Sequence, residues 1–297
     1  MRDNDPVTSA TRQPGTPDAA TPPRLIATDL DGTLLRDDKS VSPRTVAALA
    51  AAEEAGIEVF FVTGRPARWM DVVSDHVHGH GLAICGNGAA VVDLHGGPGA
   101  HRFVTVRDLA RDNALDAVRL LRDAAPGTVY AVEQTYGFNQ EPDYPKLHME
   151  IPDVRAPAEV LLRGDAPGAS EPVLKILAHH PTLDPDVFLA LARTAIGDRA
   201  NVTRSSPSAL LEISGPGVSK ASTLALCCAE RGISPEEVVA FGDMPNDVEM
   251  LTWAGRSYAM GNAHPEVIAA ASGRTVANNE DGVAVIIERM LGERRVR

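Results

Sequence analysis

The sequence has few aromatic residues and less positive than negative charge. Aromatic side chains make up 4% of the 297 residues, which disfavours a lectin that stacks on sugars or a protein that stacks on single-stranded bases. Lys and Arg number 28 against 40 Asp and Glu, which gives a formal net charge of −12. General nucleic-acid binders carry a basic surface, so this balance predicts no nucleic-acid partner.

Cysteines and long apolar runs are also scarce. Cys227 and Cys228 are neighbours and Cys85 lies far away in the sequence, so a disulfide framework is excluded and we expect a reduced, cytoplasmic protein. No apolar run approaches the roughly 18 residues of a membrane span, which predicts no membrane partner. Residues 1–23 hold five prolines and several acids without an apolar signal segment, and we expect them to form a disordered tail.

What the sequence does contain is an alternation of buried strands and helices. Residues 25–28, 57–62 and 82–85 are short apolar runs, and a helix with Ser42 as its N-cap separates the first two. This alternation predicts a parallel sheet with helices on both faces. The pattern returns in the last third of the chain, with a further buried strand at 238–241.

A different pattern interrupts the alternation between residues 89 and 214. Strand-like pieces and helical stretches follow one another there, with frequent Gly, Pro and Asp between them. We therefore predict an α/β fold in which residues 24–88 and 215–297 form a doubly wound, mainly parallel sheet. Residues 89–214 are predicted to form an inserted domain.

Chemically capable residues follow several of the predicted strands. They lie directly after a strand or at the start of a neighbouring helix: Asp29, Asp31, Thr63, Lys220, Asp243, Asn246 and Asp247. In open α/β sheets, ligands bind beyond the carboxyl ends of the strands. Four stretches that are far apart in the sequence are therefore expected to meet at one edge of one sheet.

Four aspartates in one crevice would repel each other strongly. Each like-charged pair about 4 Å apart costs several kcal/mol at an effective dielectric constant of about 20, so the cluster requires a bound cation or a shared proton. Every candidate ligand is an oxygen, which favours Mg²⁺ held together with a substrate phosphate. Lys220, Thr63 and Asn246 would supply positive charge and hydrogen-bond donors to that phosphate.

Each motif also has a simpler interpretation. Asp29-x-Asp31-Gly could be a plain turn, although an EF-hand calcium loop is excluded because its twelfth position would be Ser40 rather than Glu. Thr63 alone could be a helix N-cap and Lys220 a surface lysine. For Arg65, a structural ion pair and a substrate contact are equally compatible with the sequence.

Taken in order, four motifs resemble those of the haloacid dehalogenase superfamily. They are Asp29-Leu-Asp-Gly-Thr-Leu-Leu35, Val62-Thr-Gly-Arg65, Ser219-Lys220 and Gly242-Asp-Met-Pro-Asn-Asp247. The turn Gly86-Asn-Gly-Ala89 and the segment Asn279-Glu-Asp-Gly-Val-Ala284 are similar to the Cof-type sugar phosphatase branch. The resemblance covers the chain after about residue 24, and it implies a Rossmann-like core with an α/β cap inserted between the second and third motifs.

The resemblance also implies a role for each matched residue. Asp29 would be the nucleophile that forms an aspartyl-phosphate and a ligand of Mg²⁺. Asp31 would be the general acid and base, and its backbone carbonyl would bind the metal. Asp243 would complete the protein ligands of Mg²⁺. Asp247 would support the metal site without binding the ion itself, or would orient Lys220. The expected phosphate-binding residues are Gly32, Thr63, Gly64, Lys220 and Asn246.

These roles predict a Mg²⁺-dependent phosphatase that hydrolyses a small phosphomonoester, such as a sugar phosphate, a nucleotide or a cofactor phosphate. A phosphomutase with the same aspartates and a catalytically idle regulatory protein on the same scaffold are the alternatives. The cap holds polar residues that could face the substrate, none of them singled out by the sequence: Glu133, Tyr136, Asn139, Lys146 and His148. We expect a monomer or weak homodimer whose partner is a small phosphorylated metabolite.

Overall fold

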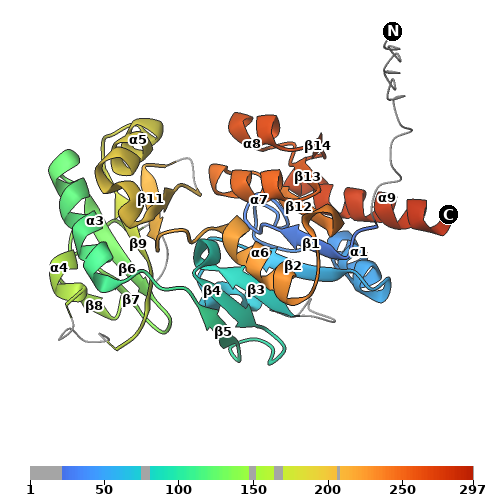
Figure 1. The fold of residues 1–297 in the computed structure, drawn as a ribbon, viewed down its shortest axis with the longest axis horizontal. Helices are drawn as coiled ribbons and strands as arrows, with labels where there is room; N and C mark the ends of the chain where they lie inside the picture. The colour runs from blue at the N-terminus through green and yellow to red at the C-terminus, as the bar shows by residue number, and fades with distance from the viewer. Residues whose placement is uncertain (1–21, 75–80, 147–151, 164–169, 206–207, 297) are drawn as a thin grey trace, which may run out of the picture.

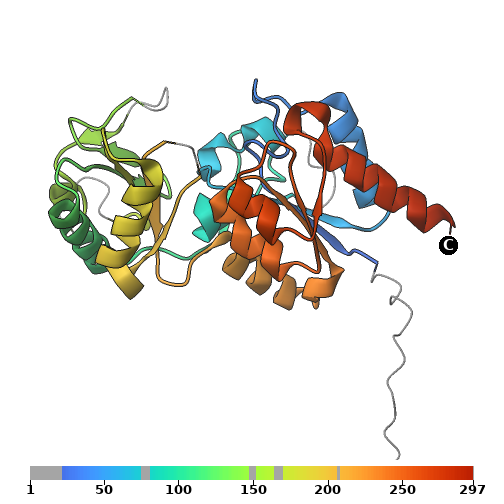
Figure 2. The same cartoon turned by 90° about the horizontal axis from the view of Figure 1, so that it is seen from above.

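Two β-sheets organise the described part of the chain. The computed structural model describes residues 22–74, 81–146, 152–163, 170–205 and 208–296, so the predicted tail lies outside the described residues except for its last two. Figure 1 shows two bodies beside each other, and they stay separate in the turned view of Figure 2. We call the body on the right the core (residues 24–106 and 219–296) and the body on the left the cap (residues 110–214).

The core sheet has the strand order β14-β13-β12-β1-β2-β3-β4-β5. Its strands are β1 (Leu25–Thr28), β2 (Glu58–Val62), β3 (Leu82–Cys85), β4 (Ala90–Asp93), β5 (Arg102–Val106), β12 (Val238–Gly242), β13 (Arg256–Ala259) and β14 (Gly273–Arg274). All neighbouring pairs from β14 to β3 are parallel, and β1 lies between β12 and β2. The segments that follow β12, β1 and β2 are therefore adjacent at one edge of the sheet.

Helices cover both faces of the core sheet, which confirms the predicted doubly wound architecture. One face is covered by α1 (Pro43–Glu54) and α9 (Gly282–Val296). The other face is covered by α6 (Lys220–Glu230), α7 (Val248–Trp253) and α8 (Pro265–Ala270). The short helix α2 (Asp71–Ser74) follows β2. Ile26 of β1 packs in the first cluster and its neighbours Leu25 and Ala27 pack in the second. Burial on both faces explains the uninterrupted apolar runs in the sequence. Among the described helices, none has the length and apolar character needed to cross a membrane.

The cap sheet has the order β10-β11-β9-β6-β7-β8 and is antiparallel except for its β7–β8 pair. Its strands are β6 (Val129–Gln134), β7 (Phe138–Gln140), β8 (Val154–Arg155), β9 (Val173–His179), β10 (Asn201–Thr203) and β11 (Leu210–Ser214). The cap helices α3 (Arg111–Ala124), α4 (Ala158–Leu161) and α5 (Pro185–Ile196) share one hydrophobic cluster with the sheet. In Figure 1, α3 and α4 lie on the side of the cap away from the core.

The core sheet continues past the predicted boundary at residue 88. Strands β4 and β5 were expected in the inserted domain, but β4 pairs with β3 and β5 pairs with β4, both antiparallel. Because β5 is an edge strand with most of its residues exposed, it lacks the apolar run that marks the buried strands. The chain crosses into the cap near Asp108 and returns near Gly215, where a Cβ atom would lie 2.8 Å from the Asp108 carbonyl oxygen.

Candidate active site

Side chains from four separate stretches meet where β1, β2 and β12 end. Asp29 and Asp31 follow β1, Thr63 follows β2 and Asp243 follows β12. The backbone N–H of Asp29 donates to the carbonyl of Phe241 at 3.1 Å, so this residue is still anchored to the neighbouring strand. The structure therefore brings the predicted residues of the first, second and fourth motifs to one edge of the sheet.

Lys220 of the third motif links two of the aspartates. Its Nζ donates to Asp29 Oδ1 at 2.7 Å and to Asp247 Oδ1 at 2.6 Å. Burial alone would lower the pKa of Lys220, but the two carboxylates outweigh burial and raise that pKa above its ordinary value. The side chain is placed by α6, which begins at Lys220 because Ser219 caps the helix with its hydroxyl.

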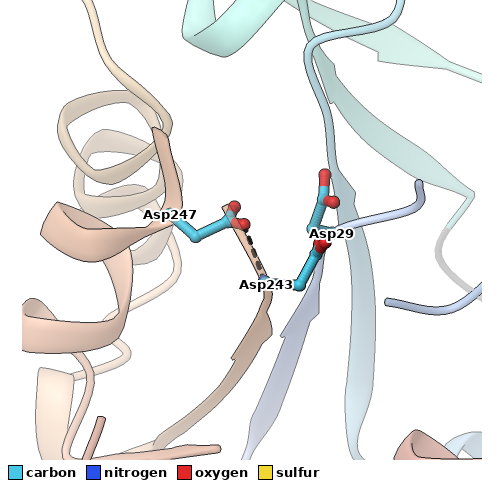
Figure 3. A group of neighbouring side chains, drawn as sticks. All are labelled: Asp29, Asp243 and Asp247. Carbon is cyan, nitrogen blue, oxygen red and sulfur yellow. Dashed lines mark hydrogen bonds between the residues drawn. The ribbon is translucent and has the colours of Figure 1, made fainter. Parts of the chain in front are cut away.

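Asp29, Asp243 and Asp247 form a cluster of buried carboxylates, shown in Figure 3. One oxygen from each lies within 4.8 Å of the others. Burial raises the pKa of Asp29 well above its usual range, and the charges of Asp247 and Asp243 add to this effect against the opposing charge of Lys220. Burial and the charge of Asp247 raise the pKa of Asp243 to about 7. Gathering these carboxylates is therefore costly, and a bound cation would relieve the cost.

The donor set of the cluster suits a hard divalent cation. All of its side-chain donors are carboxylate oxygens, which Mg²⁺ accepts and which soft metals do not favour. Asp247 uses Oδ1 for Lys220 and Oδ2 for the backbone N–H groups of Asp243 and Met244, at 3.0 and 3.1 Å. Its oxygens are thus engaged in fixing the loop after β12. Asp29 and Asp243 could hold the cation directly, with Asp247 supporting them.

Gly32 permits the close approach of the first and fourth motifs. Its φ angle is +76°, and a Cβ atom at this position would lie 2.3 Å from Asp243 Oδ2. Thr33, the next residue, donates its hydroxyl proton to Asp243 Oδ1 at 2.8 Å. The Asp-x-Asp-Gly-Thr sequence therefore supplies the turn and a hydrogen bond that orients Asp243.

Asp31 does not belong to the carboxylate cluster. Arg65 binds its side chain through two hydrogen bonds of 2.5 and 2.7 Å, and Lys39 Nζ donates to it at 2.8 Å. Burial would raise the pKa of Asp31, but the hydrogen bonds from Arg65 and Lys39 prevail and lower it to about 2. Arg65 thus forms an ion pair here, and Asp31 is ionised.

The remaining predicted phosphate-binding residues lie beside this group. The Thr63 hydroxyl accepts from the backbone N–H of Arg65 at 3.0 Å, which leaves its own proton to be donated. Asn246 donates through Nδ2 to Asn87 Oδ1 at 3.0 Å. A Cβ atom on Gly64 would lie 3.2 Å from the same Asn87 oxygen. Asn87, predicted only as part of a turn, therefore contacts two site segments.

A cavity of about 420 Å³ lies between the core and the cap, over the site residues. Asp29, Asp31, Thr63 and Asn246 are among its core residues. Its cap residues are Glu133, Phe138, Lys175, Leu177, Ser205, Leu210 and Glu212. The cavity therefore has a charged floor and a partly apolar roof, and its volume lies in the range of small-molecule sites.

Of the cap residues suggested by the sequence, Glu133 lines this cavity and is bound by Arg68 of the core. Tyr136 is 71% exposed, Lys146 is exposed, and Asn139 is buried with a hydrogen bond to Gln134. His148 lies outside the described residues.

Two further charged residues, Lys175 and Glu212, line the same cavity and were not expected there from the sequence. Each is a single charged residue inside an apolar strand, in Val-Leu-Lys-Ile-Leu and Leu-Leu-Glu-Ile. A charge in such a run is expensive to bury unless it is paired. This pattern is the signal that could have identified both residues.

Known proteins are similar to this chain over most of its length. The family model of the haloacid dehalogenase-like hydrolases matches residues 26–287. The chain is 30% identical over 268 residues to the 5-amino-6-(5-phospho-D-ribitylamino)uracil phosphatase YitU of Bacillus subtilis, a match that covers 89% of this chain and 96% of that protein. It is 30% identical over 253 residues to the HMP-PP phosphatase of Citrobacter koseri, covering 83% of this chain and 87% of that protein.

A solved structure shows the same fold. A haloacid dehalogenase-like hydrolase from B. subtilis matches with a TM-score of 0.75 and 24% sequence identity, covering 89% of this chain and 99% of that one. The family predicted from the four motifs is thus supported by the sequence comparisons, and the fold by this structural comparison. The chain belongs to the haloacid dehalogenase-like hydrolases.

Proposed function

We propose that this hydrolase is a Mg²⁺-dependent phosphatase that cleaves a small phosphomonoester through an aspartyl-phosphate on Asp29. The observation that carries the proposal is the buried hydrogen-bonded group of Asp29, Lys220 and Asp247, in which Asp29 lines the cavity between core and cap. Both relatives described above are named phosphatases, and the name of one specifies a small phosphorylated metabolite. This supports phosphatase chemistry on a small ester.

In the first half-reaction, an oxygen of Asp29 attacks phosphorus and the bond to the ester oxygen breaks. Lys220 lies within hydrogen-bond distance of the Asp29 carboxylate, so its charge would favour the ionised nucleophile and attract the phosphoryl oxygens. Thr63 can donate its hydroxyl proton to one of these oxygens. Bound Mg²⁺ would neutralise negative charge on the carboxylates and the phosphoryl group.

The ligands we propose for Mg²⁺ are Asp29, Asp243 and the backbone carbonyl of Asp31. The first two contribute to the buried carboxylate cluster, which fits a hard cation. Asp247 would hold Lys220 and the loop that carries Asp243, through the hydrogen bonds described above. Gly32, Gly64 and Asn246 would complete the binding site for the phosphoryl group.

Asp31 would exchange a proton with the leaving oxygen and then with water. In its ionised state, paired with Arg65 and Lys39, it is ready to accept a proton from water in the second half-reaction. The first half-reaction requires a proton on the same carboxyl, which these two ion pairs oppose. Movement of Arg65 or Lys39 off Asp31 when the ester binds would let this carboxyl take up that proton.

A panel of several dozen phosphate esters, assayed for inorganic phosphate with and without Mg²⁺, tests the proposal. We expect phosphate to be released from at least one small ester when Mg²⁺ is present and not when it is absent. Isomerised sugar phosphate without released phosphate would instead identify a phosphomutase. No turnover of any ester, with Mg²⁺ shown to bind, would contradict the proposal and favour a regulatory protein.

A further inference from the structure

The cap contains a buried ion pair that contacts the core directly. Lys175 of β9 donates to Glu212 Oε2 of β11, and its Nζ also donates to the Gly64 carbonyl oxygen in the core at 2.6 Å. The two side chains are only 5% and 4% exposed. Ser205 adds a hydrogen bond to the other carboxylate oxygen, Glu212 Oε1. The pair therefore forms part of the contact between cap and core.

The alternation of the cap strands places this pair on the sheet face opposite the cap helices. Ile176, Leu211 and Ile213 belong to the hydrophobic cluster that packs against those helices. Lys175 and Glu212 alternate with them along β9 and β11 and line the cavity. A buried ion pair is often no more stabilising than apolar residues of the same volume, so stability alone is a weak reason for these charges.

Glu212 is also the cap end of a hydrogen-bonded series that enters the active site. Asn87 Nδ2 donates to Glu212 Oε2 at 2.8 Å, while Asn87 Oδ1 accepts from Asn246 Nδ2 at 3.0 Å. Asn87 has a positive φ angle of 55°, which is uncommon for a residue other than glycine. Asn246 directly precedes Asp247, whose carboxylate binds Lys220. The series thus runs from the cap to the phosphate-binding edge of the core.

We propose that Glu212, oriented by Lys175, is a positioning residue that couples closure of the cap to the orientation of Asn246. The cavity is lined by both cap and core, so separation and closure of the two bodies would control how an ester is held in it. Separation removes the Glu212 acceptor from Asn87 and the Gly64 acceptor from Lys175. Closure restores both contacts and fixes Asn246 for the phosphoryl group. This inference rests on the proposed phosphatase function.

Glu212 also lines the cavity, so a direct contact with the leaving group is the competing interpretation. The two roles differ in what they require of the ligand. A positioning residue affects every phosphate ester, and also a phosphate mimic that has no leaving group. A residue that contacts the leaving group affects esters according to the group they carry. Orthovanadate and two esters with different leaving groups, glycerol 2-phosphate and p-nitrophenyl phosphate, are therefore suitable probes.

The test compares Glu212→Gln with Glu141→Gln. Glu141 is also a buried cap glutamate, but its hydrogen bonds go to Arg122, Tyr130 and Ala158, all of them in the cap. We expect Glu212→Gln to weaken vanadate binding with Mg²⁺ about tenfold, the value of one hydrogen bond to a charged group. It should lower kcat/KM for both esters by a similar factor, whereas Glu141→Gln should leave these quantities at the wild-type level.

Asn87→Gly serves as a second variant if Glu212→Gln folds poorly, because glycine tolerates the positive φ angle and the ion pair is kept. We expect the same loss of vanadate affinity, and no further loss in the double variant. Small-angle scattering without ligand should show Glu212→Gln to be more extended than wild type and Glu141→Gln.

Unchanged vanadate affinity in Glu212→Gln, or losses that differ between the two esters, would overturn the inference. So would equal dimensions of Glu212→Gln and Glu141→Gln in solution. A wild-type protein that hydrolyses no ester contradicts the proposed function instead, and the scattering comparison still tests the cap contact in that case.

Discussion

The core and the cap place their charged cavity residues in different parts of their sheets. In the core, Asp29, Thr63 and Asp243 follow β1, β2 and β12. In the cap, Lys175 and Glu212 lie inside strands, on the face that is turned toward the core. The same cavity is thus built from strand ends on one side and from a sheet face on the other.

The coverage of each sheet explains this difference. Helices pack on both faces of the core sheet, so its strand interiors are apolar and charged groups can be placed only at the strand ends. The cap helices pack on one face of the cap sheet, in a single hydrophobic cluster. The other face of the sheet is therefore available for polar side chains. We therefore expect changes in the core to affect the reaction itself, and changes in the cap to affect closure or the choice of ester.

The largest effect is expected from Asp29→Asn. The amide cannot form the aspartyl-phosphate, so kcat should fall at least about 10³-fold for every ester that the wild type hydrolyses. Phosphate release under single-turnover conditions checks this, with circular dichroism to confirm folding. Turnover near the wild-type rate would show that the core does not supply the nucleophile.

Much of this core could be predicted from the sequence. The runs at 25–28 and 82–85 match β1 and β3 residue for residue, and Ser42 caps α1 as expected. Buried strands and capped helices leave local signals, and the four motifs occupy the turns next to them. The ion pairs of Asp31 with Arg65 and Lys39 could not be predicted, because they depend on side-chain orientation across two loops.

The cap could be predicted much less well. The apolar runs at 129–132 and 173–177 predict strands, and β6 and β9 contain them. Lys175 and Glu212 could be seen as partners only once the register of β9 and β11 was known. The segments of β4 and β5 were expected in the inserted domain but belong to the core sheet, because antiparallel pairing at a sheet edge has no clear sequence signal. Long-range pairing, rather than local propensity, determines these features.

Removal of Mg²⁺ is expected to have the second largest effect. Without the cation, the buried carboxylates near Asp29 repel the negatively charged ester and favour the protonated form of Asp29. Chelation by EDTA should therefore lower phosphate release at least about a hundredfold. Added Mg²⁺ should restore activity. Full activity in metal-free buffer would contradict the proposed role of the carboxylate cluster.

Gly32→Ala is expected to have a smaller but still large effect on activity. Its Cβ would lie 2.3 Å from Asp243 Oδ2, so the fourth-motif loop must shift and kcat/KM should fall about a hundredfold. Gly56→Ala is the matched control, because Gly56 has the same φ of +76° and no atom within 4 Å of an added Cβ.

Both glycine variants should lose about 1 kcal/mol of unfolding free energy from the strained backbone, measured by urea denaturation. Only Gly32→Ala should lose activity. Equal activity losses in the two variants would mean that backbone strain, and not the contact with Asp243, explains the need for glycine.

Leu177→Ala tests the cap and should have the smallest effect on catalysis. Leu177 lines the cavity and packs with Phe138 and Leu210. Its truncation should raise KM a few-fold for p-nitrophenyl phosphate, because about 1 kcal/mol of apolar contact with the leaving group is lost. Glycerol 2-phosphate, which has a small polar leaving group, should be hydrolysed as by wild type.

Leu189→Ala is the control for Leu177→Ala. It removes a buried leucine of α5, in the hydrophobic cluster on the helical side of the cap. Both variants should lose stability in thermal denaturation, but only Leu177→Ala should distinguish the two esters. Equal losses on both esters would show that this part of the cap does not select the leaving group.

The central claim is that Asp29 carries the phosphoryl group during the reaction. Wild-type enzyme is mixed with Mg²⁺ and an intact ester that it is known to hydrolyse. The mixture is quenched within milliseconds, reduced with borohydride and digested for mass spectrometry. Because borohydride reduces an acyl phosphate to an alcohol, we expect homoserine in place of aspartate at position 29. Cleavage of the ester with Asp29 unmodified, or with the label on another residue, would contradict the account.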